Sequence, residues 1–312
     1  INNAGYLTNG ITLPNEPVTM QVVGKNYFFN INASNNLTIS GDGLLESKIM
    51  NTNGAAVVTV NSGVTLNARY QTEIDGVTFY TIYGTYSGGV QIDPDEKLIL
   101  ASGATLEVSA ENALMFSQDT SFDNWALRQG ARIVNNSIIL LPLGTTPEQI
   151  AALPLEGLGA VLVPTSYDED GNPAVWNTYN NDGVALKIVG VGTGLDLTDG
   201  DYGSKTVAND GYAWDSDSKT LTLGNVCVLG SVTLPAAATI VTTGPAVVRG
   251  RIMGEYGVAL HFVFSGKAQL NITRGISGAV NGDTVTVQGG AQVSMGSSLF
   301  LGASGAAGGT LN

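Results

Sequence analysis

Four pairs of aspartates come closest, by residue type and spacing, to a set of residues that could do chemistry. The two members of each pair stand two positions apart. Two carboxyl groups held several ångströms apart across a glycosidic bond can hydrolyse it. Every pair lies beside Gly, Pro, Ser or Asn, where Asp also forms Asx turns, so a turn role is the default interpretation. The pairs are Asp93/Asp95, Asp168/Asp170, Asp199/Asp201 and Asp215/Asp217.

Calcium is the metal ion that suits the acidic loops, because it takes clustered oxygen ligands. The loops lack the twelve-residue spacing of an EF-hand, so any calcium site here would be of another kind. A single His and a single Cys make transition metals poor candidates. We expect no other cofactor. The candidate calcium ligands are Asp168, Asp170, Asp196, Asp199 and Asp201.

Aromatic side chains are the other candidate ligand-binding groups. A flat ring can stack on a sugar ring while its N–H or O–H stays hydrated. Trp176 is favoured because it stands in a polar segment with several Asn residues, whereas Trp214 fits equally well as a cap over the core. The candidate ligand-binding residues are Trp176, Tyr179, Tyr167, Trp214 and Tyr212.

The remaining reactive side chains form no catalytic set in the sequence. Cys227 is the only cysteine, so no internal disulfide can form, and we expect a small thiol on the outer side of its strand. His261, the only histidine, is expected on an outer face without a nucleophile motif. Arg249, Arg251 and Arg274 could meet an acidic sugar or form a solvated edge. We therefore name no catalytic residue and favour a non-enzymatic protein, leaving activity open.

Short strands must position these side chains. Between Thr220 and Leu301 apolar residues alternate with polar ones in brief runs, which is typical of strands with one buried face. The gaps are too short for hairpins of stable length, whereas a solenoid buries all the apolar pairs in one core. The pairs are Leu221/Leu223, Val226/Val228, Val232/Leu234, Val258/Leu260, Leu270/Ile272, Val285/Val287, Val293/Met295 and Leu299/Leu301.

A glycine-led phrase recurs in both halves of the chain. Glycine is followed by a small or apolar residue, a polar one and an aliphatic one, so that glycine supplies a corner with positive φ before each new strand. The irregular spacing predicts a right-handed parallel β-helix without the strict hexapeptide rhythm of a left-handed one. The phrase begins at Gly63, Gly103, Gly130 and Gly290.

The fold prediction is an all-β, right-handed parallel β-helix with three parts, or one continuous domain over residues 1–312. Residues 1–143 form a strand-rich solenoid part, for which a β-sandwich is the alternative. Residues 144–210 form an excursion with a short helix near 146–153 and a polar loop or hairpin. Residues 211–312 form β-helix coils. In the first part, an Asp75-Gly76 hairpin is one reading of a Tyr-rich stretch.

The net charge of the chain narrows the classes of partner that it could bind. Lys plus Arg total 13 and Asp plus Glu total 26, so the formal charge is 13 − 26 = −13. An acidic surface repels phosphate backbones and anionic lipids, so we expect neither nucleic-acid binding nor direct membrane insertion.

The chain begins at Ile1 without Met and ends in a small-residue tail. We expect a piece of a longer secreted protein with flanking domains.

The stretch Gly211-Tyr-Ala-Trp-Asp-Ser-Asp-Ser-Lys-Thr-Leu-Thr-Leu223 resembles a phrase that opens repeats in secreted parallel β-helix surface proteins of Firmicutes-type bacteria. Those proteins are similar to the pectate-lyase-like carbohydrate-binding family. The resemblance implies an extracellular location, either secreted or at the cell surface. It also implies a polysaccharide or host cell-surface glycan as partner, with calcium.

The leading functional prediction is a non-catalytic secreted or cell-surface protein that binds carbohydrate or acts as an adhesin. One alternative is a pectin-lyase-like polysaccharide lyase or glycoside hydrolase, which would need carboxylates or Arg to converge from several coils. The other alternative is a structural stalk of a larger surface protein. Sequence spacing alone does not decide among them.

Overall fold

The computed structural model describes residues 1–4, 6–7, 9–51, 56–109, 113–191, 194–198, 211–255, 257–278, 283–296, 299–300 and 310–311. Strands make up 56% and helices 3%, and stacked parallel strands form a β-solenoid of about 12 turns, which confirms the predicted fold class. The chain divides into unit 1 (Ile1–Glu107 and Met115–Val134) and unit 2 (Val108–Leu114 and Asn135–Asn312). No described helix has the length and apolar character needed to cross a membrane.

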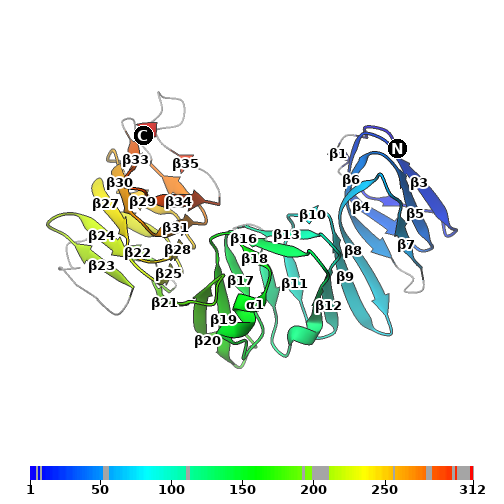
Figure 1. Cartoon of the computed structure of the whole chain (residues 1–312), viewed down its shortest axis with the longest axis horizontal. Coiled ribbons are helices and arrows are strands. Elements are labelled where there is room, and N and C mark those ends of the chain that lie inside the picture. Colours follow the sequence, from blue (N-terminus) through cyan, green and yellow to red (C-terminus); the bar gives the residue numbers. More distant parts are fainter. Residues whose placement is uncertain are drawn as a thin grey trace. The chain divides into compact units, whose positions relative to one another are not determined.

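Unit 1 begins as a stack of parallel strands, drawn in blue to cyan in Figure 1. From β1 to β8 each described pairing is parallel, which excludes the sandwich alternative for this part. Its main sheet contains β1 (Tyr6–Leu7), β2 (Ile11–Thr12), β4 (Lys25–Ala33), β6 (Leu44–Asn51), β8 (Thr65–Ile74), β9 (Val77–Tyr83), β12 (Glu96–Leu100) and β15 (Trp125–Leu127), and a second sheet contains β3 (Val18–Val22), β5 (Leu37–Gly41) and β7 (Val58–Val60).

Shorter elements complete unit 1 and its junction in sequence with unit 2. The 3₁₀ helix η1 (Phe122–Asn124) is capped by Ser121, whose side chain accepts from the Asp123 backbone N–H. The short strands are β10 (Thr85–Tyr86), β11 (Val90–Ile92), β13 (Thr105–Val108), β14 (Leu114–Phe116) and β16 (Arg132–Asn135).

An antiparallel hairpin between β8 and β9 interrupts the parallel stack. It turns at Asp75 and Gly76, whose φ angles of 52° and 80° suit a two-residue hairpin turn. Residues directly opposite in a ladder share a face, and Arg69 of β8 lies opposite Ile82 of β9. Ile82 is fully buried, as is its β12 partner Leu100. The outward face of β8 therefore continues into the buried face of β9 and β12.

Glycine corners separate the strands as the sequence predicts. Gly63, Gly103, Gly130 and Gly290 all have positive φ, between 70° and 103°. A side chain is strained in this region, so glycine is the natural residue at each corner. The recurrent phrase thus marks real turns of the solenoid.

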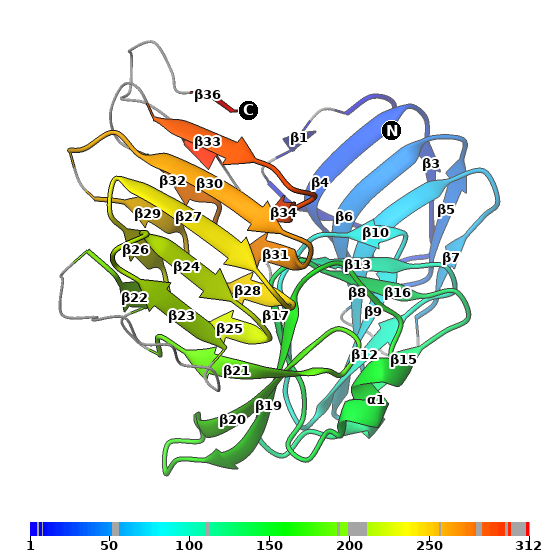
Figure 2. The same ribbon diagram turned by 60° about the vertical axis from the view of Figure 1, so that its left-hand side comes forward.

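Unit 2 ends in a stack of three parallel sheets, one of which Figure 2 shows from β24 to β33. Leu221 pairs with Ile240 and Ile240 with Phe264, so the coils stack like residues over one another in a single core. The sheets contain β24 (Thr220–Leu223), β27 (Ala237–Thr242), β30 (His261–Gly266), β33 (Thr284–Val287) and β36 (Thr310–Leu311), with β23 (Tyr212–Asp215) antiparallel to β24; β21 (Ala185–Val189), β25 (Val226–Val228), β28 (Ala246–Val248), β31 (Gln269–Ile272) and β34 (Gln292–Met295); and β22 (Leu195–Asp196), β26 (Val232–Leu234), β29 (Ile252–Gly254), β32 (Ile276–Ser277) and β35 (Leu299–Phe300).

Two valines depart from the predicted alternation. Val258 is 43% exposed, although it was expected on the buried face with Leu260, because strand β30 begins only at His261. Val287, expected to be buried with Val285, is 39% exposed as the last residue of β33. Alternation fixes a face only while the chain stays in a strand.

The connecting part of unit 2 contains the predicted helix, α1 (Pro147–Ala152), together with β17 (Ile138–Leu140), β18 (Leu155–Glu156), β19 (Ala160–Tyr167) and β20 (Pro173–Asn180). Thr146 caps α1 by accepting from the Gln149 backbone N–H, and the Gln149 side chain accepts from the Thr146 N–H. The predicted polar hairpin is the antiparallel β19–β20 pair.

Outer sheet faces also pack against one another within unit 2, which corrects the expectation for Cys227. The thiol does lie opposite the face of Val226 and Val228, but it is fully buried in a small apolar cluster with Leu162 of β19 and Leu186 of β21. Nearby, the Asn271 side chain donates to the Asn136 carbonyl at 3.2 Å. Sequence alternation shows which face a residue takes but not what covers that face.

Candidate functional site

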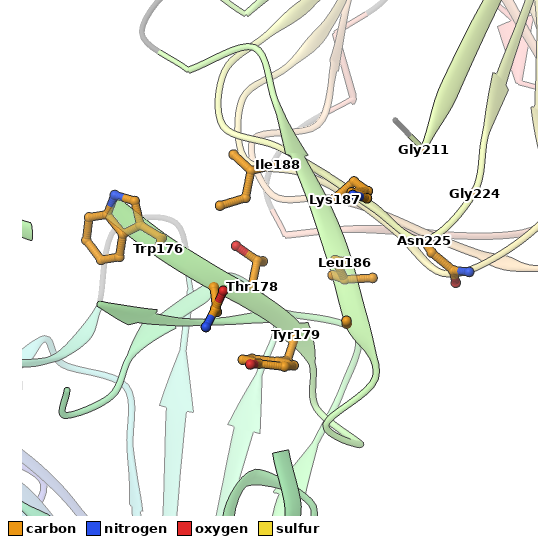
Figure 3. Close-up of a pocket in the computed structure, with 11 residues that line it drawn as sticks. Trp176, Thr178, Tyr179, Leu186, Lys187, Ile188, Gly211, Gly224 and Asn225 are labelled. Carbon is orange, nitrogen blue, oxygen red and sulfur yellow. The ribbon is translucent and has the colours of Figure 1, made fainter. Parts of the chain in front are cut away.

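A groove of about 610 Å³ opens where β20 and β21 separate. The two strands pair only through Thr178–Leu186 and Tyr179–Ala185. Beyond this point β21 continues beside β25, and β20 continues beside β19. Figure 3 shows the two strands meeting near Tyr179 and Leu186 and diverging toward Trp176 and Ile188.

Both faces of the diverging strands contribute to the groove. Trp176 and Tyr179 lie an odd number of positions apart on β20, so they point to opposite sides of the strand. The groove therefore follows the open strand edge rather than one sheet face. Its lining residues are Trp176, Asn177, Thr178, Tyr179, Ala185, Leu186, Lys187, Ile188, Gly211, Gly224 and Asn225.

Trp176 is anchored on one side and open on the other. Its ring packs against the apolar cluster that contains Leu162 and Cys227, while the side chain as a whole is only half-buried. Tyr179 is also half-buried. A ring held by packing loses little conformational freedom when a ligand stacks on it.

Polar groups surround these rings. The Thr178 hydroxyl is buried and has no hydrogen-bond partner among the described residues. A buried hydroxyl without a partner is costly, and this oxygen has almost no accessible surface, so it belongs to the wall of the groove and does not contact a ligand. Lys187 and Asn225 add an ammonium and an amide, and Asn177 is exposed. Sequence reasoning did not select Thr178, Lys187 or Asn225, because only the pairing of β20 with β21 and of β21 with β25 brings them to one place.

A tight turn fixes the relation between β20 and β21. The Asn180 side-chain oxygen accepts from the backbone N–H groups of Asp182 and Val184, each at 2.9 Å. Gly183, with φ of 77°, completes the turn. This Asx-type geometry returns the chain so that the two strands meet at Tyr179.

The other predicted aromatic residues lie outside the groove lining. Trp214 is 4% exposed and belongs to the core, the role that the sequence left open for it. Tyr212 is half-buried and packs against the same core. Tyr167 is half-buried at the end of β19 and lies opposite Pro173. Only Trp176 and Tyr179 are brought together.

The predicted calcium ligands that the structure describes act in turns. Asp168 accepts from the backbone N–H groups of Asp170 and Asn172 at 3.0 and 2.8 Å. Asp196 accepts from the backbone and hydroxyl of Thr198. Within the described ranges, no three His, Cys, Asp or Glu side chains gather as metal ligands would. Asp199 and Asp201 lie outside the described residues.

Asp215 likewise serves a turn. Its carboxylate accepts from the Ser218 hydroxyl at 2.8 Å and from the backbone N–H groups of Asp217 and Ser218. These hydrogen bonds, that of the hydroxyl first, lower the pKa of Asp215 below its ordinary value. The turn interpretation is confirmed for Asp168 and Asp215.

The Cys227 thiol is held in its protonated form. Burial raises its pKa to about 12, and the positive charge of Arg249 lowers it only in part. A thiol in this state is a poor nucleophile. His261 is exposed, and its Nδ1 lies 2.8 Å from the Thr284 hydroxyl.

No protein-family model matches the chain, and neither a curated protein nor a solved structure matches it. The fold itself defines the class of the protein as a β-solenoid.

Proposed function

We propose that this protein is a non-catalytic, secreted or cell-surface protein that binds polysaccharide through the Trp176 groove, in the manner of a lectin or adhesin. The observation that supports it is the half-exposed Trp176 ring beside the hydrogen-bonding groups of Asn177, Lys187 and Asn225. Stacking on a ring plus hydrogen bonds to hydroxyls is the chemistry that recognises a sugar. The volume lies in the usual range for small ligand sites, roughly 300–1,000 Å³.

The lining favours binding over bond cleavage. No Asp or Glu stands among the described residues that line the groove, whereas a glycosidase needs two carboxyl groups across the scissile bond. The resemblance of residues 211–223 to pectate-lyase-like carbohydrate-binding proteins adds the extracellular location and the polysaccharide class to the proposal.

A glycan array tests the proposal, with wild type and Trp176→Ala compared in the presence and absence of calcium. Loss of stacking should weaken binding at least tenfold, equal to about 1.4 kcal/mol. Tyr167→Ala is the matched control, because Tyr167 lies on the same hairpin but outside the lining. Both variants must melt like the wild type.

Three results would overturn the proposal. Equal losses in Trp176→Ala and Tyr167→Ala would place binding elsewhere. Progressive shortening of a bound polysaccharide would make the protein an enzyme. No binding to any glycan would leave a structural stalk as the function.

A further inference from the structure

Two cations stand side by side on the main sheet of unit 1. Lys48 of β6 and Arg69 of β8 are partners in the parallel ladder, and both are half-buried. Neighbouring strands lie about 4.8 Å apart, so the bases of the two side chains are close. Only 13 of the 312 residues are Lys or Arg. Two like charges in register repel each other unless an anion lies between them.

The described contacts of these two cations leave the position of an anion between them open. Lys48 Nζ lies 5.5 Å from the centre of the Phe29 ring, and Arg69 Cζ lies 5.0 Å from the centre of the Tyr80 ring. Arg69 Nε is buried and has no hydrogen-bond partner among the described residues. Burial lowers the pKa of Lys48, and the charge of Arg69 lowers it further.

Two acids lie near the pair, and the hydrogen bonds of the described residues join neither of them to Lys48 or Arg69. Glu96 of β12 accepts from the Tyr80 hydroxyl at 2.7 Å and from the Asp93 backbone N–H at 3.0 Å. Glu46, two positions before Lys48 on β6, is exposed and lies opposite Tyr27 and Asn67. The Lys48–Arg69 pair therefore keeps capacity for an external carboxylate.

A β-bulge places an aromatic ring beside this pair. The register between β4 and β6 shifts between Tyr27 and Asn30, so that an extra residue is accommodated. Phe28 is buried, whereas Phe29 is 53% exposed on the same side as Lys48. Bulges re-aim side chains and occur often beside functional sites.

Lys48, the ladder partner of Arg69, lines a groove of about 460 Å³ that lies entirely within unit 1. Four aromatic residues and several hydrogen-bonding groups line it together with Lys48. A bare anion would use only the cations, whereas a sugar ring with a carboxylate would use the rings and hydrogen-bonding groups as well. The side chains that could contact such a sugar are those of Tyr27, Phe29, Glu46, Lys48, Asn67 and Tyr86.

We propose that this groove binds a saccharide that carries a carboxylate. The carboxylate pairs with Lys48, and the charge of Arg69 on the neighbouring strand adds to the attraction from outside the lining. The ring stacks on Phe29 or Tyr86, and Glu46 and Asn67 bond the sugar hydroxyls. This site uses residues of unit 1 alone and does not depend on the Trp176 groove.

Titration calorimetry on the full chain tests the inference. A short galacturonic acid oligomer and a sialylated trisaccharide represent two sources of the carboxylate, and their uncharged counterparts, a galactose oligomer and lactose, serve as comparison. We expect at least one acidic sugar to bind at least tenfold more tightly than its neutral counterpart. Lys48→Gln and Arg69→Gln should each reduce that binding at least tenfold, and Lys48→Arg should preserve most of it.

Lys97→Gln is the matched control, because Lys97 is an exposed cation of the same sheet. Trp176→Ala should leave this binding unchanged, which separates the result from the proposed function. If Arg69→Gln does not fold, Lys48→Gln and Lys48→Arg still decide. Equal affinity for neutral and acidic sugars, an equal loss in Lys97→Gln, displacement by inorganic sulfate at equal affinity, or no binding of either acidic sugar would each overturn the inference.

Discussion

The side-chain amides of Asn135 and Asn181 meet at 2.8 Å although 46 positions separate them in sequence. Asn135 also donates to the Ala160 carbonyl, and Asn181 donates to the carbonyls of Glu156 and Gly157 at 3.0 Å. Both side chains are buried. This network ties the β20–β21 turn to the start of β19, and so it holds the strands whose divergence forms the Trp176 groove.

Replacing Asn181 with Ala should therefore lower the free energy of unfolding by about 2–4 kcal/mol, because buried polar groups would lose their partners. Urea unfolding measures this value. Asn177→Ala is the control, since Asn177 is exposed on the same hairpin, and its effect should stay within about 0.5 kcal/mol. Equal effects of the two variants would contradict the structural role of the network.

Two glycines allow the stability cost of a left-handed backbone conformation to be measured apart from the cost of close packing. Gly84 and Gly103 have similar φ angles of 61° and 70°, but a Cβ at Gly84 would lie 2.1 Å from the Leu66 carbonyl oxygen, whereas a Cβ at Gly103 meets nothing within 4 Å. Gly103→Ala should cost about 1–2 kcal/mol for the left-handed conformation. Gly84→Ala should lower the free energy of unfolding by clearly more. Urea unfolding measures both values. Equal costs would show that the coils are less closely stacked.

The buried thiol of Cys227 predicts stability that falls in alkaline solution. The folded pKa of about 12 lies above the ordinary value of 9.0, so the unfolded state loses the thiol proton first. The contribution is intact below pH 9 and declines between pH 9 and about 12, by about 1.4 kcal/mol per pH unit. Cys227→Ala should flatten this decline, although Tyr80, with its pKa raised to about 12, keeps its own share in both proteins. The same slope in both would contradict the prediction.

The three tryptophans should differ in their access to a quencher. Trp125 and Trp214 are buried, whereas Trp176 is half-buried. Acrylamide should quench the wild-type emission mainly through Trp176, and Trp176→Phe should remove most of that quenching without lowering the melting temperature. Quenching that persists unchanged would mean that Trp176 is covered in solution.

Local sequence signals account for most of the fold. Period-two alternation identified the strands, and the glycine phrase identified the corners. Asp75-Gly76 gave one hairpin, and Thr146-Pro147 gave the helix start. Each of these signals acts within a few residues, so a single sequence contains enough information to find it.

The structure was needed to show which strand faces are buried and which residues they bring together. Alternation cannot tell which face of β9 is buried after an antiparallel turn, so the placement of Arg69 opposite the buried Ile82 was not foreseen. In the same way, Trp176 and Tyr179 could be selected by residue type, while Asn225 reaches the groove only through the register of β21 with β25.

The contact between Asn271 and the Asn136 carbonyl spans 135 positions, whereas the ladder partners Leu221 and Ile240 stand one coil apart. Loop closure over a short interval loses less chain entropy than closure over a long one. The coils should therefore propagate from neighbour to neighbour during folding, and the packing of outer faces within unit 2 should come last. In this part of the chain, neighbouring coils should therefore pair first and the outer faces should pack afterwards. Cys227 should become buried only in that last step.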